Sequence, residues 1–266
     1  MREDLTEPIA TGRTAEIYGW ENGQVVKLFH DWFRREDIDY ERRISQSVYA
    51  SGLPVPSVSE IIQVEGRNGL LYERIEGVSM GEKLLKKPWR IFRYAPRMAE
   101  LHVEMHGKTL PLKVPDLREK LQGKIHRAKA LPVPLRERVL TALKGMPKGD
   151  RLCHGDFHPG NIMIRQHKEV IIDWIDVALG NPLADLARTG IILIGMAENQ
   201  VGQNPFLKAF VRGFHSLYLR HYFSLRPGGK EEYKDWLPLV AAARLSENIK
   251  ELESWLITQA SKINTR

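Results

Sequence analysis

The sequence contains a single cysteine and no long hydrophobic run, and both shortages limit the kind of protein it can be. One cysteine among 266 residues excludes an internal disulfide, so we expect a reducing, cytoplasmic setting. The longest apolar run, near residues 190–197, is far shorter than the roughly 18–20 residues of a membrane span. The opening MREDLTEP is charged and lacks the apolar segment of a signal peptide. We therefore predict no membrane partner and no signal peptide.

Negative charge is scarce in one part of the chain only. Residues 78–153 carry 18 Lys+Arg against 7 Asp+Glu, whereas residues 1–77 carry 9 against 14 and residues 154–266 carry 13 against 12. The basic residues of this segment alternate with apolar positions at helical spacing, as at Leu117 and Leu121. That pattern favours solvated helix faces, with an anionic ligand or surface partner as the second interpretation. We do not expect a nucleic-acid partner.

Periodicity and turn residues predict an α+β chain in two parts. Residues 9–29 indicate a hairpin around Glu21-Asn22-Gly23, residues 34–50 a helix, and the segment SVSEIIQVEGRNGLLYERIEG two strands with a turn at residues 66–69. Beyond Gly77 the pattern is mainly helical. The helices expected there cover residues 90–106, 116–130, 135–145, 183–197, 205–222 and 238–260, with short strands at 161–164 and 170–173. This predicts a small β-rich N-terminal lobe over 1–77 and a larger, mainly helical C-terminal lobe over 78–266.

Two charged residues fall on apolar faces of the N-terminal lobe. Strand alternation puts Lys27, within VVKLF, on the same face as Phe29, and helical periodicity puts Glu41 among Ile44 and Val48. A buried carboxylate needs a partner, and Lys27 is the nearest candidate in sequence. A strand lysine paired with a helix glutamate holds the α- and β-phosphates of the nucleotide in kinases. The plainer alternatives are that Lys27 snorkels to solvent and that Glu41 turns to the surface.

The segment HGDFHPGNIM, residues 154–163, has the spacing of a kinase catalytic loop. His154, Asp156 and Asn161 match the pattern H-x-D-x-x-x-x-N, and the apolar strand that follows ends in Asp173. Phosphoryl transfer needs a carboxylate that orients the attacking hydroxyl and hard oxygen ligands for Mg²⁺. The spacing predicts Asp156 as the catalytic base and Asn161 with Asp173 as the metal ligands.

Rival interpretations of this segment are weaker. Zinc would need Cys153, His154 and His158 to converge, but adjacent residues of an extended chain project oppositely, and Pro159-Gly160 prevents a helical face. A Cys153–His154 nucleophile pair fails for the same reason. We expect His154 to be a buried hydrogen-bonding support for the loop.

Together these segments resemble the aminoglycoside phosphotransferase and choline kinase family, small-molecule kinases with a protein-kinase-like bilobal fold. The resemblance is carried by LCHGDFHPGNIM, VIIDWIDVALGNPLADLA, VVKLF, GLPVP and LYERIEG, in the family's order over about residues 11–190. It implies a nucleotide-binding lobe over 1–77, a catalytic and substrate-binding lobe over 78–266, Mg²⁺, and ATP or GTP as co-substrate. It also implies that backbone groups of Glu73 and Ile75 bind the purine and that Asp185 is mainly structural.

The phosphate loop and one strand residue depart from the family's pattern. The loop is reduced to TGRTAE, in which Gly12 is the single glycine, so Thr11, Arg13 and Thr14 are alternative phosphate donors and a plain β-turn is equally open. Tyr72 falls where the family has its gatekeeper, and a bulky ring there makes GTP use an open possibility.

The acceptor of the phosphate is not indicated by the sequence. Aminoglycosides are polycations, whereas residues 154–266 are nearly neutral and residues 78–153 are basic. Glu247 and Glu251 are expected to form an exposed acidic helix face. An aminoglycoside, amino alcohol, sugar or related metabolite is therefore open as the acceptor. The alternative to a kinase is a catalytically silent kinase-like domain that binds a nucleotide or a partner. The oligomeric state is not indicated either.

Overall fold

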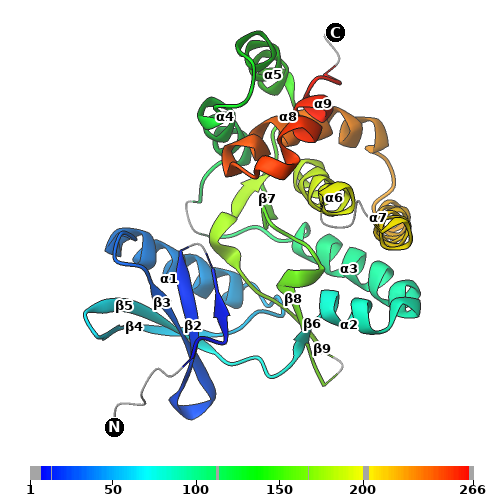
Figure 1. Ribbon diagram of the computed structural model, residues 1–266. Helices are drawn as coiled ribbons and strands as arrows, with labels where there is room; N and C mark the ends of the chain where they lie inside the picture. Colours follow the sequence, from blue (N-terminus) through cyan, green and yellow to red (C-terminus); the bar gives the residue numbers. More distant parts are fainter. Residues whose placement is uncertain (1–6, 13, 112–113, 167, 200–203, 264–266) are drawn as a thin grey trace. The chain divides into compact units, whose positions relative to one another are not determined.

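The computed structural model describes residues 7–12, 14–111, 114–166, 168–199 and 204–263. The chain divides into two compact units, shown in Figure 1: unit 1 is Met1–Ser79 with Ile162–Ile175, and unit 2 is Met80–Asn161 with Asp176–Arg266. Unit 1 holds an antiparallel sheet and unit 2 is mainly helical, so the predicted α+β class is confirmed. None of the helices in the described part of the chain combines the length and apolar character that crossing a bilayer requires.

Unit 1 is built on a five-stranded antiparallel sheet in the order β1-β2-β3-β5-β4. Its strands are β1 (Ala10–Thr11), β2 (Ala15–Trp20), β3 (Gln24–Phe29), β4 (Val58–Val64) and β5 (Arg67–Glu73). The predicted hairpin joins β2 to β3, and its Asn22 and Gly23 take left-handed φ values of 56° and 70°, as tight hairpins require. The second turn is shorter than predicted: it lies at residues 65–66, and Gly69 is inside β5, where a Cβ would come within 2.5 Å of a Val26 methyl.

Helix α1 (Arg35–Ala50) packs against β4 and β5. Its buried stripe is the predicted one and consists of Ile38, Glu41, Ile44, Ser45 and Val48. A smaller sheet in the order β6-β8-β9 completes unit 1. Its strands are β6 (Val78–Ser79), β8 (Ile162–Arg165) and β9 (Lys168–Ile171), the last two close to the predicted strands.

Unit 2 consists of packed helices and one short strand pair. The helices are α2 (Met80–Lys86), α3 (Ile91–Met105), α4 (Leu117–Arg127), α5 (Val133–Gly145), α6 (Pro182–Asn199), α7 (Pro205–Leu225), α8 (Lys230–Arg244) and α9 (Glu253–Ala260). Helix α3 packs on α7 and α6 on α8, while β7 (Arg151–Cys153) pairs with β10 (Ala178–Gly180).

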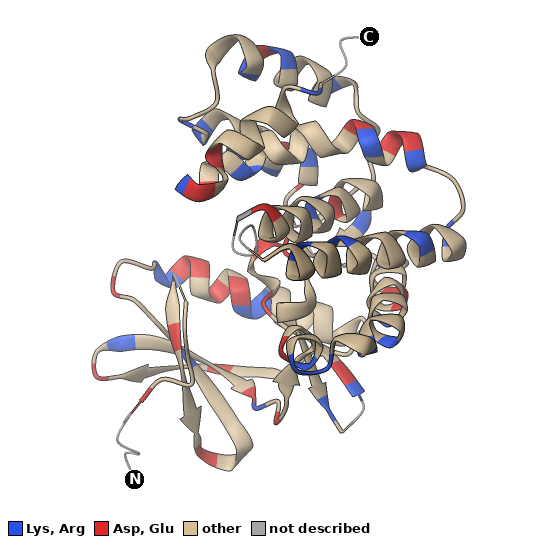
Figure 2. Ribbon diagram, turned by 45° about the vertical axis from the view of Figure 1, so that its right-hand side comes forward, with Lys and Arg blue, Asp and Glu red and all other residues tan. Residues whose placement is uncertain are grey.

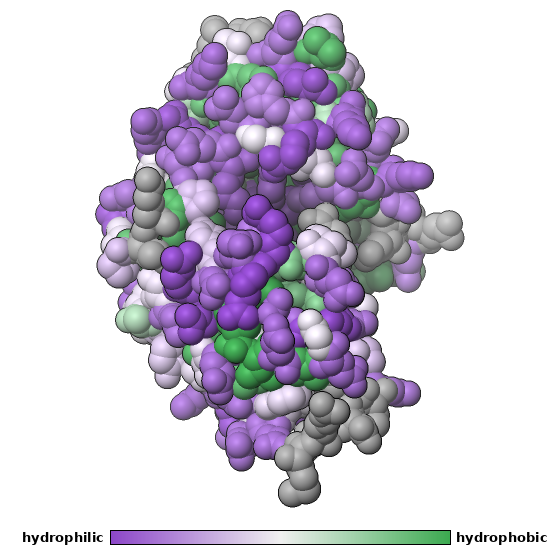
Figure 3. All heavy atoms as spheres, turned by 90° about the vertical axis from the view of Figure 1, so that its left-hand side faces the viewer, coloured by the Kyte–Doolittle hydropathy of each residue, from purple (hydrophilic) through white to green (hydrophobic). Residues whose placement is uncertain are grey.

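Basic and acidic residues are interspersed along the helices in Figure 2, and the face in Figure 3 is mostly hydrophilic with smaller hydrophobic patches.

The prediction of the last helix in unit 2 is wrong. A continuous helix over 238–260 was expected, but α8 begins at Lys230 and ends at Arg244, and the chain passes through two short 3₁₀ turns before α9. Asn248 interrupts the helix with a left-handed φ of 55°. The break carries Glu247 inward, where its side chain is 21% exposed and forms ion pairs, so the expected exposed acidic face is also wrong at this residue.

Candidate active site

The loop over 154–161 follows β7 and is fixed by a glycine that no other residue can replace without strain. Gly155 has a φ of 79°, and a Cβ there would lie 2.6 Å from the carbonyl oxygen of Asp176. The loop ends in a 3₁₀ turn, Pro159–Asn161, closed by a bond from the Asn161 N–H to the His158 carbonyl oxygen at 2.9 Å. The Pro-Gly pair therefore turns the chain back towards Asp156.

The carboxylate of Asp185, in the first turn of α6, holds this loop in place by accepting hydrogen bonds from its backbone. The His154 N–H donates to its Oδ2 and the Gly155 N–H to its Oδ1, each at 2.8 Å. The Nε2 atoms of His102 and His106, on α3, lie 3.1 and 3.3 Å from Oδ2. Asp185 is completely buried at its side chain, so these four donors replace water, and its expected structural role is confirmed.

The two histidines under Asp185 are neutral and belong to a hydrogen-bond network. Burial lowers the pKa of His102 to about 3, with the neighbouring His106 adding to the effect, and burial also lowers the pKa of His106. The Nδ1 atoms contact the hydroxyls of Tyr218 and Tyr222 on α7, the second at 2.8 Å. Among the described residues, one cluster has the side chains and spacing of a metal site: His102, His106 and Asp185. Its nitrogen and oxygen atoms are already hydrogen-bonded to each other and to the two phenols.

The side chain of Asp156 is partly accessible and lies beside Arg188 and His158. Its Oδ1 lies 3.4 Å from Nη2 of Arg188 and its Oδ2 lies 3.5 Å from Nε2 of His158, with 32% of the side chain exposed. Burial alone would raise the pKa of Asp156, but the His158 contact and the Arg188 charge lower it well below its usual range. The carboxylate is therefore ionised at neutral pH and free to accept a further hydrogen bond.

Asn161 and His158 hold Asp156 in place. The Asn161 amide nitrogen donates to the Asp156 carbonyl oxygen at 2.9 Å and to its Oδ2 at 3.3 Å. The Gly160 N–H donates to Nδ1 of His158, which leaves a proton on the Nε2 that faces Asp156. His154 is fully buried and its Nδ1 accepts the Asp156 N–H, which confirms its expected supporting role. The zinc interpretation fails here, because the Cys153 thiol is buried and donates to the Arg151 carbonyl oxygen.

In unit 1, Lys27 and Glu41 form the ion pair that periodicity predicted. Nζ of Lys27 lies 2.7 Å from Oε1 of Glu41, and the two side chains are 14% and 5% exposed. Neither alternative applies, since Lys27 does not extend to solvent and Glu41 stays inside. The Tyr72 hydroxyl donates to the same Oε1 at 2.9 Å and lies 3.2 Å from Oγ of Ser45. Burial, and then the charge of Glu41, raises the pKa of Tyr72 well above its usual value, so the phenol stays protonated.

The other predicted site residues of unit 1 lie at turns and strand ends. Asp173 follows β9, is exposed, and has a left-handed φ of 65°, an uncommon conformation for a residue with a side chain. Glu73 ends β5, where its side chain pairs with Arg165 at 3.1 Å, and Ile75 lies in the segment that leads to β6. Gly12 begins the β1–β2 turn and donates to the Ala15 carbonyl oxygen at 2.9 Å. Arg13 lies outside the described residues.

A family model described as the phosphotransferase enzyme family matches residues 8–227. The chain belongs to that family. It is thus a phosphotransferase of the small-molecule kinase type, as the motifs predicted. No curated protein sequence matches this phosphotransferase.

Solved structures share the fold of this phosphotransferase at low sequence identity, and the predicted kinase-like fold is confirmed. An aminoglycoside-3'-phosphotransferase of type VIII is 19% identical, with a TM-score of 0.58 and 92% of each chain covered. The amicoumacin kinase hAmiN, in complex with AMP-PNP, Ca²⁺ and Ami, is 16% identical, with a TM-score of 0.62 and coverage of 96% of this chain and 86% of that one. APH(3'')-Id from Streptomyces rimosus is 16% identical, with a TM-score of 0.61 and coverage of 89% and 92%.

Several charged residues around the loop of the phosphotransferase were missed by the sequence reasoning. Arg188 donates from Nε to the Gly155 carbonyl oxygen at 2.9 Å, and its Nη2 lies 2.6 Å from Oε1 of Glu247. Asp176 accepts from two lysines of α4, and Arg244 ends α8 beside Glu247. One signal was present: Arg188 and Arg244 are single cations within the apolar stretches PLADLARTGIILIG and LVAAARL.

Proposed function

We propose that this phosphotransferase transfers the γ-phosphate of ATP or GTP, with Mg²⁺, to a hydroxyl group of a small molecule. The observation that carries the proposal is the ionised and partly exposed Asp156, held by Asn161, His158 and Arg188 on a loop that Asp185 fixes. In this proposal residues 78–266 supply catalysis and acceptor binding, and residues 1–77 supply nucleotide binding.

Asp156 would act as the catalytic base by accepting a hydrogen bond from the attacking hydroxyl. A carboxylate with a strongly lowered pKa is a weak proton acceptor, so its main contribution is to orient the hydroxyl towards the phosphorus. The proton transfers as the new bond to phosphorus forms and the alcohol oxygen becomes more acidic. Arg188 keeps the carboxylate ionised between turnovers.

Lys27 would hold the phosphates of the nucleotide, with Glu41 and Tyr72 setting its position. The Lys27–Glu41 pair is nearly buried, so the ammonium group keeps a fixed direction while its remaining protons stay available to phosphate oxygens. The Gly12 turn would cover the phosphates, and backbone groups of Glu73 and Ile75 would bind the purine. The Tyr72 hydroxyl donates a hydrogen bond to Glu41, which fixes the position of the ring on β5.

The donor chemistry of Asn161 and Asp173 suits Mg²⁺. Asn161 uses its amide nitrogen on Asp156, which directs its carbonyl oxygen elsewhere, and Asp173 offers an exposed carboxylate held in a strained turn. When bound there, the metal would neutralise charge on the transferred phosphoryl group. One relative was solved with a nucleotide analogue and Ca²⁺, which supports a divalent ion in the reaction.

A nucleotide-consumption screen tests the proposal. Aminoglycosides, choline-like alcohols, sugars, amino acids and nucleosides are each offered with ATP and with GTP in the presence of Mg²⁺. We expect at least one acceptor to be phosphorylated and Asp156→Asn to lower kcat on it by about 10²–10⁴ fold while nucleotide binding survives. Full activity of the Asp156→Asn protein would show that the base is another residue. Nucleotide binding with no transfer to any acceptor would instead favour the silent kinase-like domain.

A further inference from the structure

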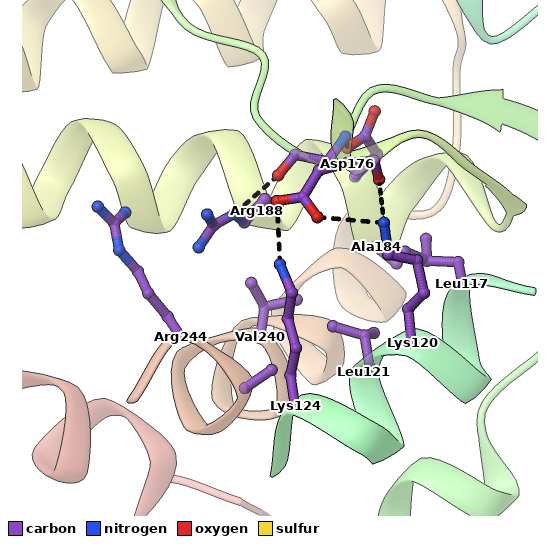
Figure 4. A pocket seen from close by; sticks show the side chains of 12 residues that line it. Leu117, Lys120, Leu121, Lys124, Asp176, Ala184, Arg188, Val240 and Arg244 are labelled. Carbon is purple, nitrogen blue, oxygen red and sulfur yellow. Dashed lines mark hydrogen bonds and ion pairs between the residues drawn. The ribbon is translucent and has the colours of Figure 1, made fainter. Parts of the chain in front are cut away.

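A narrow pocket of unit 2 gathers four cationic side chains beside the Asp156 loop. Figure 4 shows Lys120 and Lys124 rising from α4, Arg188 from α6 and Arg244 from the end of α8. Backbone of Gly155 lines the same pocket, so the loop that carries Asp156 forms part of its wall. The volume is about 30 Å³. Since one water needs about 10–15 Å³, this is room for a small polar group and not for a ring.

Two carboxylates, Asp176 and Glu247, are each shared by two of the four cations of this pocket. Asp176 is shared by the two lysines, with Nζ of Lys120 3.1 Å from Oδ1 and Nζ of Lys124 3.1 Å from Oδ2. Glu247 is shared by the two arginines, at 2.6 Å from Arg188 and 3.4 Å from Arg244. Asp185 also lines the pocket, and its carboxylate already accepts four hydrogen bonds, two from histidine side chains of α3 and two from backbone N–H groups of the catalytic loop.

Arg244 is the cation with unused donors. It is 8% exposed; its Nη1 has no hydrogen-bond partner among the described residues, and its Nε has only the ion-pair contact with Glu247 at 3.4 Å. Burial, and then the charge of Arg188, lowers the pKa of Arg244 to about 10, so it remains charged at neutral pH. A buried guanidinium with free N–H groups is costly to the fold unless an acceptor binds it, and its planar fork matches the two oxygens of a carboxylate or phosphate.

Arg188 links this pocket to Asp156. Its Nη2 contacts Oδ1 of Asp156 at 3.4 Å and its Nε holds the Gly155 carbonyl oxygen. Arg188 and Arg244 both contact Glu247, at 2.6 and 3.4 Å. An anionic group in this pocket would therefore lie beside the arginine that contacts the Asp156 carboxylate.

We propose that the Lys124–Arg188–Arg244 pocket binds an anionic group, a carboxylate or a phosphate, of the phosphate acceptor. The acceptor is then an alcohol that carries a negative charge, not a polycation such as an aminoglycoside, which these side chains would repel. This assignment rests on the proposed function, because it makes the pocket part of the acceptor site.

Binding of inorganic phosphate and of acetate to the full-length protein, measured by isothermal titration calorimetry, tests the pocket without any turnover. We expect Arg244→Met and Lys124→Met each to weaken binding of at least one of these anions by tenfold or more. Lys129→Met, which removes the same charge from an exposed residue just beyond α4, should change it by less than twofold. Lys124→Met keeps the test valid if Arg244→Met fails to fold by circular dichroism. Equal anion affinity in the wild type and in Lys124→Met, or no measurable binding in the wild type, overturns the proposal.

Matched acceptors then test specificity. A hydroxy acid is compared with its amide, and a sugar phosphate with the free sugar, in the nucleotide-consumption assay. We expect the anionic member of one pair to have a kcat/KM at least tenfold higher, Lys124→Met to remove that advantage and the control Lys129→Met to keep it. The pair that responds identifies carboxylate or phosphate as the ligand. Equal or better use of neutral or cationic acceptors overturns the proposal. Anion binding that depends on Lys124, with no transfer to any alcohol, would support the pocket and reject the proposed kinase function.

Discussion

Replacing Asp185 by asparagine tests whether one buried carboxylate holds the catalytic loop. Asparagine keeps a single carbonyl oxygen, and the best orientation leaves it at the Oδ2 position, where it can still accept from His102, His106 and His154. The new NH₂ group then faces the Gly155 N–H, and that charge-assisted bond, worth about 1.5–3 kcal/mol, is lost. The other three bonds lose their charge assistance, at roughly 0.5–1 kcal/mol each. Together we expect a loss of about 3–6 kcal/mol in the free energy of unfolding.

Urea unfolding at pH 7, followed by circular dichroism, measures this loss. Asp150→Asn is the matched control, since its side chain is 78% exposed and an exposed substitution should change stability by no more than about 0.5 kcal/mol. The Asp185→Asn protein should also have a reduced kcat with little change in nucleotide affinity, because the loop and not the nucleotide lobe is disturbed. A loss below about 1 kcal/mol would refute the view that Asp185 is the main support of the loop.

Three further perturbations follow from the structure. Lys27→Met leaves the Glu41 carboxylate buried without its cation, so it should cost about 3–5 kcal/mol in urea unfolding and cost more than the double variant Lys27→Met/Glu41→Gln; an equal cost would contradict this. Asp173→Gly relieves the left-handed turn and should raise stability by about 0.5–1 kcal/mol while abolishing Mg²⁺-dependent nucleotide binding; unchanged affinity would move the metal site elsewhere. The folded protein holds His102 neutral down to a pKa of about 3, whereas the unfolded chain protonates it below about 6.5. Stability is therefore complete above pH 6.5 and should fall by up to about 1.4 kcal/mol per pH unit for each such buried histidine as the pH drops towards 3; a thermal midpoint that stays constant between pH 6.5 and 4.5 would contradict it.

Local patterns in the sequence were sufficient for the features that depend on one or two neighbouring elements. The Lys27–Glu41 pair follows from strand alternation and helical periodicity, because β3 and α1 are adjacent in the chain. The H-x-D-x-x-x-x-N spacing brings Asp156 and Asn161 together within one loop, where the turn at Pro159–Asn161 closes it.

The cation pocket could not be predicted in the same way. Its residues come from α4, α6 and α8, and periodicity says which face of a helix is apolar but not which other helix covers it. The break at Asn248 is also a local exception to a helical pattern, and it is this break that turns Glu247 towards Arg188 and Arg244. A charged residue alone in an apolar helix face indicates a buried partner without identifying it.

The long-range clamp beneath the loop has a consequence for how the protein is made. His102 and His106 bond to Tyr218 and Tyr222 across 116 residues of chain, and Asp185 lies between them in sequence. A nascent chain that stops before α7 already contains the whole HGDFHPGN segment, yet its two imidazoles lack the phenols that orient them. The hydrogen bonds of these imidazoles are therefore complete only after α7 has been translated. Truncated products should contain every motif residue and still be inactive. We therefore expect proteases to degrade them before they hydrolyse any nucleotide.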